Sequence, residues 1–377
     1  MKFRLQAAAA AAALVLAACG GGGADTTPAA SINKVKVAGD SLADSGTFGL
    51  KFTVQNAGDN GGPTQIWADR VAASYGQSLC AHYRSPDRQS FSTDSSCTNY
   101  AVGGGRINYY EASTSPYSIV QQLKDMGAAG FGAGDLLLVD GGGNDAADLI
   151  KAYILASIGA EAGYKAVLGT VLDAATIDGL WAQGAQGKAQ AGGVYMQALA
   201  KQFAKAIQDE ALAKGAPRVA VLNMPGVTRT PLFLMTLKNI SQSQGAEAAG
   251  KLAALFDGWI NAFNAQLVQS LAGDKRVAVV DFYASFKDQS EHPAQYAYTN
   301  VTTPVCPVSG QDPLTKLPTY DWQACTASYL SSNPPAGQTG ANWWQSYAFS
   351  DAFHPTPYAH QLMGQLVSRS LSQAGWL

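Results

Sequence analysis

The chain has 377 residues, of which 47% are hydrophobic and 14% are charged, and its formal net charge is −2. This apolar content is enough to bury a large core in one or two domains, which excludes a mainly disordered protein. No basic patch stands out along the chain, so we expect no nucleic-acid partner.

The first residues have the pattern of a secretory signal. Lys2 and Arg4 precede an apolar run over residues 7–17, which is too short to span a bilayer. The segment that ends at Cys19, Leu-Ala-Ala-Cys, closely resembles the lipobox of bacterial lipoproteins. This resemblance implies that residues 1–18 are removed and that Cys19 carries lipid. The alternative is an ordinary signal peptide with an incidental cysteine.

By this resemblance residues 19–31 would be a lipidated cysteine and a tether. The segment after Cys19 is rich in glycine, threonine, proline and alanine, which predicts that the tether is flexible. The membrane would then be a partner only through Cys19, since no later run of eighteen apolar residues follows. We expect an exported protein. Gly20, by resemblance to enteric lipoproteins, favours an outer-membrane or cell-surface lipoprotein; otherwise the protein would be secreted or periplasmic.

Export places the chain in an oxidising compartment, where disulfides form. Four cysteines remain besides Cys19, and four cysteines allow three pairings. We expect Cys80 to pair with Cys97 and Cys306 with Cys325, because each pair is close in sequence and lies in a polar, loop-like stretch. The alternative is four free thiols.

The expected strands and helices alternate along the chain. Apolar runs such as Leu136–Val139 suit strands that are covered on both faces, as in a parallel sheet. The expected strands cover residues 34–38, 99–102, 135–140, 217–223 and 276–282. Helical patterns surround Trp67 and cover residues 146–193, 196–207, 252–267 and 361–371. This alternation predicts a doubly wound α/β fold, with one domain over residues 32–377 and insertions near 146–193 and 283–346.

A serine follows the first expected strand directly. Ser41 stands in Gly39-Asp40-Ser41-Leu42, and sites in open α/β sheets form outside the carboxyl ends of the strands. A nucleophilic serine needs a base and an acid that orients the base. The alternative interpretation is an ordinary turn at the end of a strand.

Asp351 and His354 supply that base and acid at a spacing of three residues, which places a carboxylate beside an imidazole on a turn. Histidine is the natural base near neutral pH, and the carboxylate would fix its tautomer. Asp288 and His292 form a rival pair, with a longer spacing and no partner motif.

Two glycine-rich loops could donate hydrogen bonds to an oxyanion. Asn144 follows three glycines after the third expected strand and has a side-chain amide that can donate. Residues 99–105 end in three glycines and can supply a backbone N–H. The alternatives are a helix N-cap at Asn144 or Asp145 and a plain turn at residues 103–105.

Four blocks, at residues 39–42, 99–105, 142–145 and 351–355, occur in the order of the GDSL, or SGNH, hydrolases, and the chain resembles this family. The tail from Phe349 to Thr356 looks most like the branch that contains plant GDSL esterases and bacterial lipase/acyltransferases. The resemblance implies a flavodoxin-like α/β/α fold with a doubly wound, five-stranded parallel sheet.

The same resemblance assigns roles to individual residues. It implies that Ser41 is the nucleophile, His354 the base and Asp351 its orienting acid. It also implies an oxyanion hole made of the Ser41 N–H, the Gly104 N–H and the Asn144 side chain. Gly103 is the alternative to Gly104, because three glycines follow one another.

These residues predict a serine-dependent carboxylester hydrolase that forms an acyl-enzyme on an ester or lipid substrate. Alternatives are a phospholipase, a lipid acyltransferase or a polysaccharide O-deacetylase with the same site and, more remotely, an inactive surface-binding lipoprotein. We expect no cofactor and no catalytic metal, because the chain has no P-loop, no His-Glu-x-x-His and no histidine–cysteine cluster. Aromatic residues just before Asp351 are expected to line the acyl pocket, or alternatively to form a packed loop: Trp343, Trp344, Tyr347 and Phe349.

Overall fold

The structure is a computed structural model that describes residues 31–313 and 315–377. The expected leader at residues 1–18, Cys19 and nearly all of the expected tether lie outside the described residues. In the part of the chain that is described, no helix has the length and apolar character needed to cross a bilayer.

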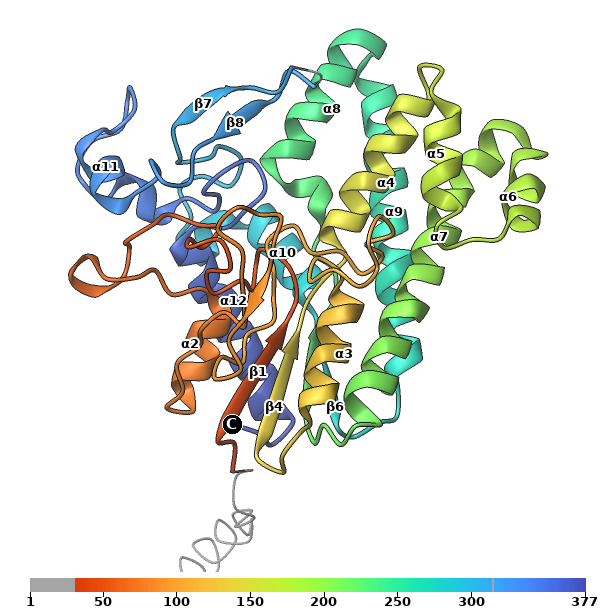
Figure 1. Ribbon diagram of the computed structural model, residues 1–377. Coiled ribbons are helices and arrows are strands. Elements are labelled where there is room, and N and C mark those ends of the chain that lie inside the picture. The colour runs from red at the N-terminus through yellow and green to blue at the C-terminus, as the bar shows by residue number, and fades with distance from the viewer. Residues whose placement is uncertain (1–30, 314) are drawn as a thin grey trace, which may run out of the picture.

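A parallel sheet of four strands forms the centre of the molecule, in the order β1-β4-β5-β6 (Figure 1). The strands are β1 (Lys34–Ala38), β4 (Asp135–Val139), β5 (Val219–Leu222) and β6 (Val277–Val280). Because all four are parallel, their carboxyl ends share one edge of the sheet. The chain enters β1 at the opposite edge.

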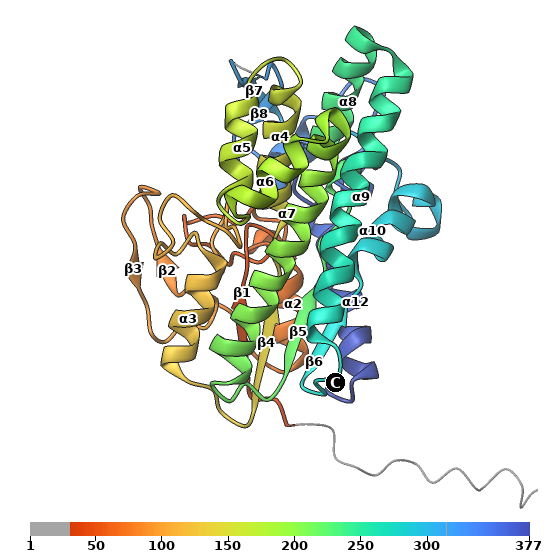
Figure 2. The same ribbon diagram turned by 90° about the vertical axis from the view of Figure 1, so that its right-hand side faces the viewer.

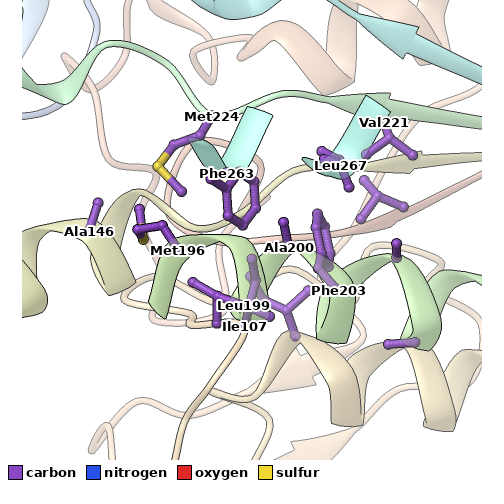
Figure 3. Close-up of a cluster of buried hydrophobic side chains, with 14 of the residues drawn as sticks. Ile107, Ala146, Met196, Leu199, Ala200, Phe203, Val221, Met224, Phe263 and Leu267 are labelled. Carbon is purple, nitrogen blue, oxygen red and sulfur yellow. The ribbon is translucent and has the colours of Figure 1, made fainter. Parts of the chain in front are cut away.

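Helices cover both faces of the sheet, so the strand side chains divide between two cores. Leu136 and Leu138 pack on one face, against α2 (Trp67–Ser74) and α12 (Pro357–Gln373). Leu137 and Val139 pack on the other face, with the core in Figure 3. The remaining helices are α3 (Ile119–Ala129), α4 (Gly143–Ala156), α5 (Glu161–Leu168), α6 (Ala174–Trp181), α7 (Gly184–Ile207), α8 (Pro231–Gln244), α9 (Ala246–Leu271), α10 (Phe282–Glu291) and α11 (Ala327–Ser332).

The two longest helices, α7 and α9, run side by side over the second face (Figure 2). Met196 and Phe203 on α7 meet Phe263 on α9 in the core shown in Figure 3. The helices approach closely because Gly192 has no side chain: a Cβ there would lie 2.2 Å from the Trp259 ring. The region 146–193, expected to be helical, contains parts of four helices, from α4 to α7.

The prediction of five strands is wrong by one, because residues 99–102 do not form a strand. Asn99 makes only isolated bridges, to Val37 and Ala81. The Gly39 N–H, which would extend the ladder, instead donates to Gln122 Oε1 at 2.8 Å. A side chain from α3 thus removes one bond from the ladder between the Tyr100 N–H, which bonds to the Val37 carbonyl, and the Val102 N–H, which bonds to the Gly39 carbonyl.

Two small hairpins and two disulfides lie outside the sheet. The hairpins join β2 (Tyr83–Arg84) to β3 (Ser92–Thr93) and β7 (Val308–Gln311) to β8 (Pro318–Tyr320). Cys80 bonds to Cys97 and Cys306 bonds to Cys325, which is the expected pairing. The second disulfide closes a loop that contains β7 and β8, beyond the carboxyl ends of β1 and β4 (Figure 1).

Candidate active site

Ser41 lies in a tight turn directly after β1, at the carboxyl edge of the sheet. The Asp40 side chain accepts the Leu42 N–H at 2.9 Å, which closes the turn around the serine. Gln122 holds the start of the turn, because it accepts the Gly39 N–H at 2.8 Å and donates to the Gly39 carbonyl at 3.0 Å. The serine is therefore carried by a backbone that is fixed on both sides.

His354 lies between Ser41 and Asp351. Its Nε2 is 2.8 Å from Ser41 Oγ, and its Nδ1 is 2.9 and 3.0 Å from the two carboxylate oxygens of Asp351. Asp351 also accepts the backbone N–H groups of Phe353 at 2.8 Å and of His354 at 2.6 Å. These bonds fix the carboxylate while it holds the imidazole.

The loop that carries His354 is tied to the rest of the fold on each side. The Ser350 N–H donates to the His354 carbonyl at 2.8 Å, and Thr53 Oγ1 donates to the Pro355 carbonyl at 2.9 Å. Thr356 then caps α12 by accepting the Ala359 N–H at 3.2 Å. The histidine is thus presented by the start of the closing helix.

Three hydrogen-bond donors come from the loops beside Ser41. The N–H groups of Ser41 and Gly104 have no acceptor among the residues that the structure describes. The Gly103 N–H, by contrast, donates to Asp44 Oδ2 at 2.8 Å, so that donor is already used. Gly104 has a φ of +81°, a conformation that favours glycine.

The Asn144 side chain is the third donor. Its amide nitrogen donates one hydrogen to the Gly105 carbonyl at 2.9 Å, which orients the group and leaves its second hydrogen for another acceptor. α4 begins at Gly143 with Gly142 as the N-cap, so Asn144 does not cap the helix. Asp145 does not cap it either, because its carboxylate accepts the N–H groups of Ile107 and Asn108, both at 2.9 Å.

Buried carboxyl groups surround the turn. Burial raises the pKa of Asp40, while the Leu42 N–H and the nearby His354 oppose that shift. Burial and the neighbouring Asp40 raise the pKa of Asp140 well above its ordinary value. Asp140 Oδ1 accepts the Asp40 N–H at 3.3 Å, and its Oδ2 has no hydrogen-bond partner within the described residues. The uncharged form of Asp140 is thus favoured beneath the nucleophile.

A cavity with about 880 Å³ of empty space, its open mouth included, adjoins Ser41. Its walls come from the carboxyl ends of β4 and β5, from α10 and from the start of α12. The apolar lining includes Leu222, Pro225, Val227, Phe282, Phe286, Val301, Phe349, Phe353 and Met363. This apolar lining is typical of a site for an apolar group.

The structure separates the other candidates from this site. Asp288 and His292 form a pair at 2.8 Å, but both side chains are about half exposed and no nucleophile accompanies them. Of the four aromatic residues expected at the pocket, only Phe349 lines it. Trp343, Trp344 and Tyr347 instead pack around the Cys306–Cys325 disulfide.

Two further aromatic residues, absent from the expectations based on sequence, contact the site. Phe52 and Trp322 both have ring centroids 5.2 Å from that of His354. No local pattern marks either residue. Within the described residues, no group of three or more histidine, cysteine or acidic side chains is placed to hold a metal ion.

The arrangement has the chemistry needed for nucleophilic substitution at a carbonyl. A hydroxyl contacts an imidazole that can take its proton, and a carboxylate bonds to the far nitrogen of that imidazole. Within the described residues, the N–H groups of Ser41 and Gly104 are free to donate, and such donors can stabilise a negative charge that develops on a carbonyl oxygen.

Comparison with known proteins gives one family match. The family model described as GDSL-like lipase/acylhydrolase matches residues 35–367, which is nearly the whole chain. Among curated proteins, no sequence matches. A lipase from a goat rumen metagenome is similar in structure, with 14% identity, 89% of this chain and 96% of that chain covered, and a TM-score of 0.39. An extracellular lipase from Streptomyces rimosus is similar at 16% identity, with 91% and 100% covered and a TM-score of 0.39.

Proposed function

The chain belongs to the GDSL-like lipase/acylhydrolase family and is a hydrolase of carboxylic esters, and we propose that it acts through an acyl-enzyme on Ser41. The contact that supports this proposal best is the 2.8 Å distance between His354 Nε2 and Ser41 Oγ. It joins residues from opposite ends of the chain in the geometry that serine activation requires.

In the proposed reaction, Ser41 Oγ bonds to the ester carbonyl carbon as its proton passes to His354 Nε2. Asp351 stabilises the imidazolium that forms. The carbon–oxygen bond to the alcohol then breaks, and the alcohol leaves with that proton. A water molecule gives its proton to His354 and attacks the acyl carbon, and the acid leaves as the proton returns to Ser41.

The oxyanion of each tetrahedral intermediate would accept three hydrogen bonds. We assign these to the Ser41 N–H, the Gly104 N–H and the Asn144 amide. The free N–H of Gly104 favours it over Gly103, whose N–H is bonded to Asp44. Donors aimed at charge that develops in the transition state typically contribute 10²- to 10³-fold in turnover.

The cavity beside Ser41 supports an aliphatic acyl group as the part of the substrate that is held. Phe286, Phe349 and Met363 are among the apolar residues that line it. Burying each methylene of an acyl chain there would contribute about 0.8 kcal/mol of binding free energy. We therefore expect kcat/KM to rise with acyl length until the cavity is filled.

Replacing Ser41 by alanine tests the proposal. We expect turnover of 4-nitrophenyl esters to fall on the order of 10³-fold or more, with no change in folding. A serine-directed phosphonate should label Ser41 in the native protein and no serine in the variant. Full activity in a folded S41A protein would exclude this mechanism. The same assay with acetyl to long-chain esters, phospholipids and acetylated polysaccharides identifies the substrate class.

We also propose how the chain is organised and where it works. Residues 1–18 would be a signal peptide, residues 19–31 a lipidated tether and residues 32–377 one hydrolase domain with insertions near 146–193 and 283–346. The two disulfides support an extracytoplasmic location, because such bonds persist in oxidising compartments. The lipobox pattern ending at Cys19 supports a membrane anchor.

A further inference from the structure

The imidazole of His354 is enclosed by aromatic rings from three parts of the chain. Phe52 stacks on it, with centroids 5.2 Å apart and planes at 27°. Trp322 meets it edge to face at 5.2 Å and 80°, and Phe353 at 5.8 Å and 86°. Phe52 and Trp322 also contact each other at 5.7 Å. Only 13% of the His354 side chain remains exposed.

The Cys306–Cys325 disulfide links the segments that carry these rings. On one side, the Cys306 N–H donates to the Ser350 carbonyl at 2.8 Å, next to Asp351. On the other side, the Gln55 N–H donates to the Cys325 carbonyl at 2.8 Å, three residues after Phe52. The disulfide, together with these two hydrogen bonds, therefore connects the loop that carries His354 to the segment that carries Phe52.

Trp322 lies inside the loop that this disulfide closes, three residues before Cys325. Phe52 extends the enclosure toward the glycine-rich loop: a Cβ on Gly103 would lie 2.1 Å from its ring. Phe52 thus borders both the proposed base and the loop that carries the Gly104 N–H, while Trp322 borders the base.

We propose that Phe52 and Trp322 are positioning residues for His354, and that the Cys306–Cys325 disulfide holds them in place. This inference rests on the proposed function, in which His354 becomes a cation each time it takes the Ser41 proton. Aromatic faces attract cations, so the stacked Phe52 ring would stabilise the imidazolium formed in the reaction, and Trp322 would restrict the position of the imidazole. They would also keep Nε2 at the distance from Ser41 Oγ that proton transfer requires.

Substituting Trp322 in the full chain tests the inference. We expect Trp322→Leu to lower kcat for a 4-nitrophenyl ester on the order of tenfold, with KM nearly unchanged. Trp322→Phe restores a ring and should recover most of the rate. Trp343→Leu is the matched control, because Trp343 packs on the same disulfide but has no ring contact with His354.

Each outcome has a defined meaning. Equal losses in Trp322→Leu and Trp343→Leu, or no rescue by Trp322→Phe, would show that the loop acts through folding alone and would overturn the inference. An active native protein with an unaffected Trp322→Leu variant would also overturn it and leave the proposed function intact. A native protein that neither hydrolyses esters nor reacts with the phosphonate would instead contradict the proposed function.

The disulfide gives a second measurement. We expect Cys306→Ser combined with Cys325→Ser to lower kcat as Trp322→Leu does. The pair Cys80→Ser and Cys97→Ser removes the other disulfide and serves as the control. Circular dichroism at the assay temperature shows whether each variant is folded. Unchanged kcat in a folded Cys306/Cys325 variant would contradict the proposed role of the bond.

Discussion

Gly39 shows how closely the nucleophile turn is packed. A Cβ at this position would lie 1.6 Å from Asp140 Oδ1, so no other residue fits without displacing a buried carboxyl group. Asp140 already has one oxygen without a hydrogen-bond partner in the described part of the chain. An unpaired buried oxygen lowers stability, and functional sites typically retain such unfavourable groups where the surrounding fold holds them in place.

At the same scale, Asn144→Ala should separate catalysis from binding. The amide would donate to charge that exists only in the transition state, so we expect kcat to fall roughly 10²- to 10³-fold while KM stays similar. Steady-state kinetics with one soluble ester measures both. Asn108→Ala is a suitable control, because the Asn108 side chain bonds to Thr170 rather than to the site loops. An unchanged kcat would remove Asn144 from the oxyanion hole.

Sequence motifs predicted which residues would lie together at the proposed site but not what surrounds them. Ser41, Asp351 and His354 stand in short local patterns, and the structure places their side chains in contact. Trp322 contacts His354 from a disulfide-closed loop, and Phe52 contacts it from the segment that follows the Ser41 turn. No sequence pattern within a few residues of Phe52 or Trp322 predicts these contacts with His354.

At the scale of elements, the start of α4 links the sheet to the glycine-rich loop. Asp145 in its first turn accepts the N–H groups of Ile107 and Asn108, and Asn144 reaches the Gly105 carbonyl. The helix therefore holds the loop at three points. Burial raises the pKa of Asp145 to about 6, although the two N–H groups favour its charged form.

Asp145→Asn should change how stability depends on pH. Because the folded-state pKa of about 6 exceeds the ordinary value of 3.8, native Asp145 contributes stability below pH 4 that is lost as pH rises through 6. The variant does not titrate there. We expect the free energy of unfolding of the native protein to fall by about 3 kcal/mol relative to the variant between pH 3.5 and 7.

Urea unfolding at several pH values measures this difference. Asp178→Asn is the control, because its side chain is 74% exposed. If the native protein and the Asp145→Asn variant keep a constant difference across this range, the pKa of Asp145 is the same in the folded and unfolded states and the burial argument is wrong.

Sequence patterns predicted the four strands and the helices between them. Leu136–Val139 and Val219–Leu222 are continuous apolar runs, as a strand buried on both faces needs. The fifth strand failed for a reason that lies far away in the chain. Gln122, which is 83 residues from Gly39, takes the N–H that would have continued the ladder. A sequence pattern within a short window cannot reveal that a side chain so far away in the chain will accept this N–H group.

At the scale of the whole molecule, the site exists only when both ends of the chain are in place. Ser41 and His354 are 313 residues apart in sequence. His360 helps to join these ends, because its Nδ1 accepts the Trp67 N–H at 3.4 Å and so connects α12 to α2. Burial lowers the pKa of His360 to about 3, which keeps this buried ring neutral at physiological pH.

Cys19→Ser should release the protein from the membrane. A diacylated cysteine buries two chains, which anchors far more firmly than one. We expect native protein in the membrane fraction and the variant in a soluble or unprocessed form. Mass spectrometry of the mature N-terminus measures the modification directly. An unmodified N-terminus beyond residue 19 would mean a freely secreted enzyme.

The direction in which the chain enters the sheet determines which side of an anchored enzyme would face the membrane. The residues before β1 join the domain at the edge opposite Ser41, since the strands are parallel and the serine follows the carboxyl end of β1. A tether from Cys19 would thus attach the protein to the membrane at the edge of the sheet opposite Ser41, so that the proposed active site would face away from the membrane. If the twelve residues 20–31 were fully extended, they would span at most about 40 Å, which would limit how freely the domain could reorient on the membrane. Such an enzyme would reach esters in the surrounding medium more readily than esters in the membrane to which it is attached.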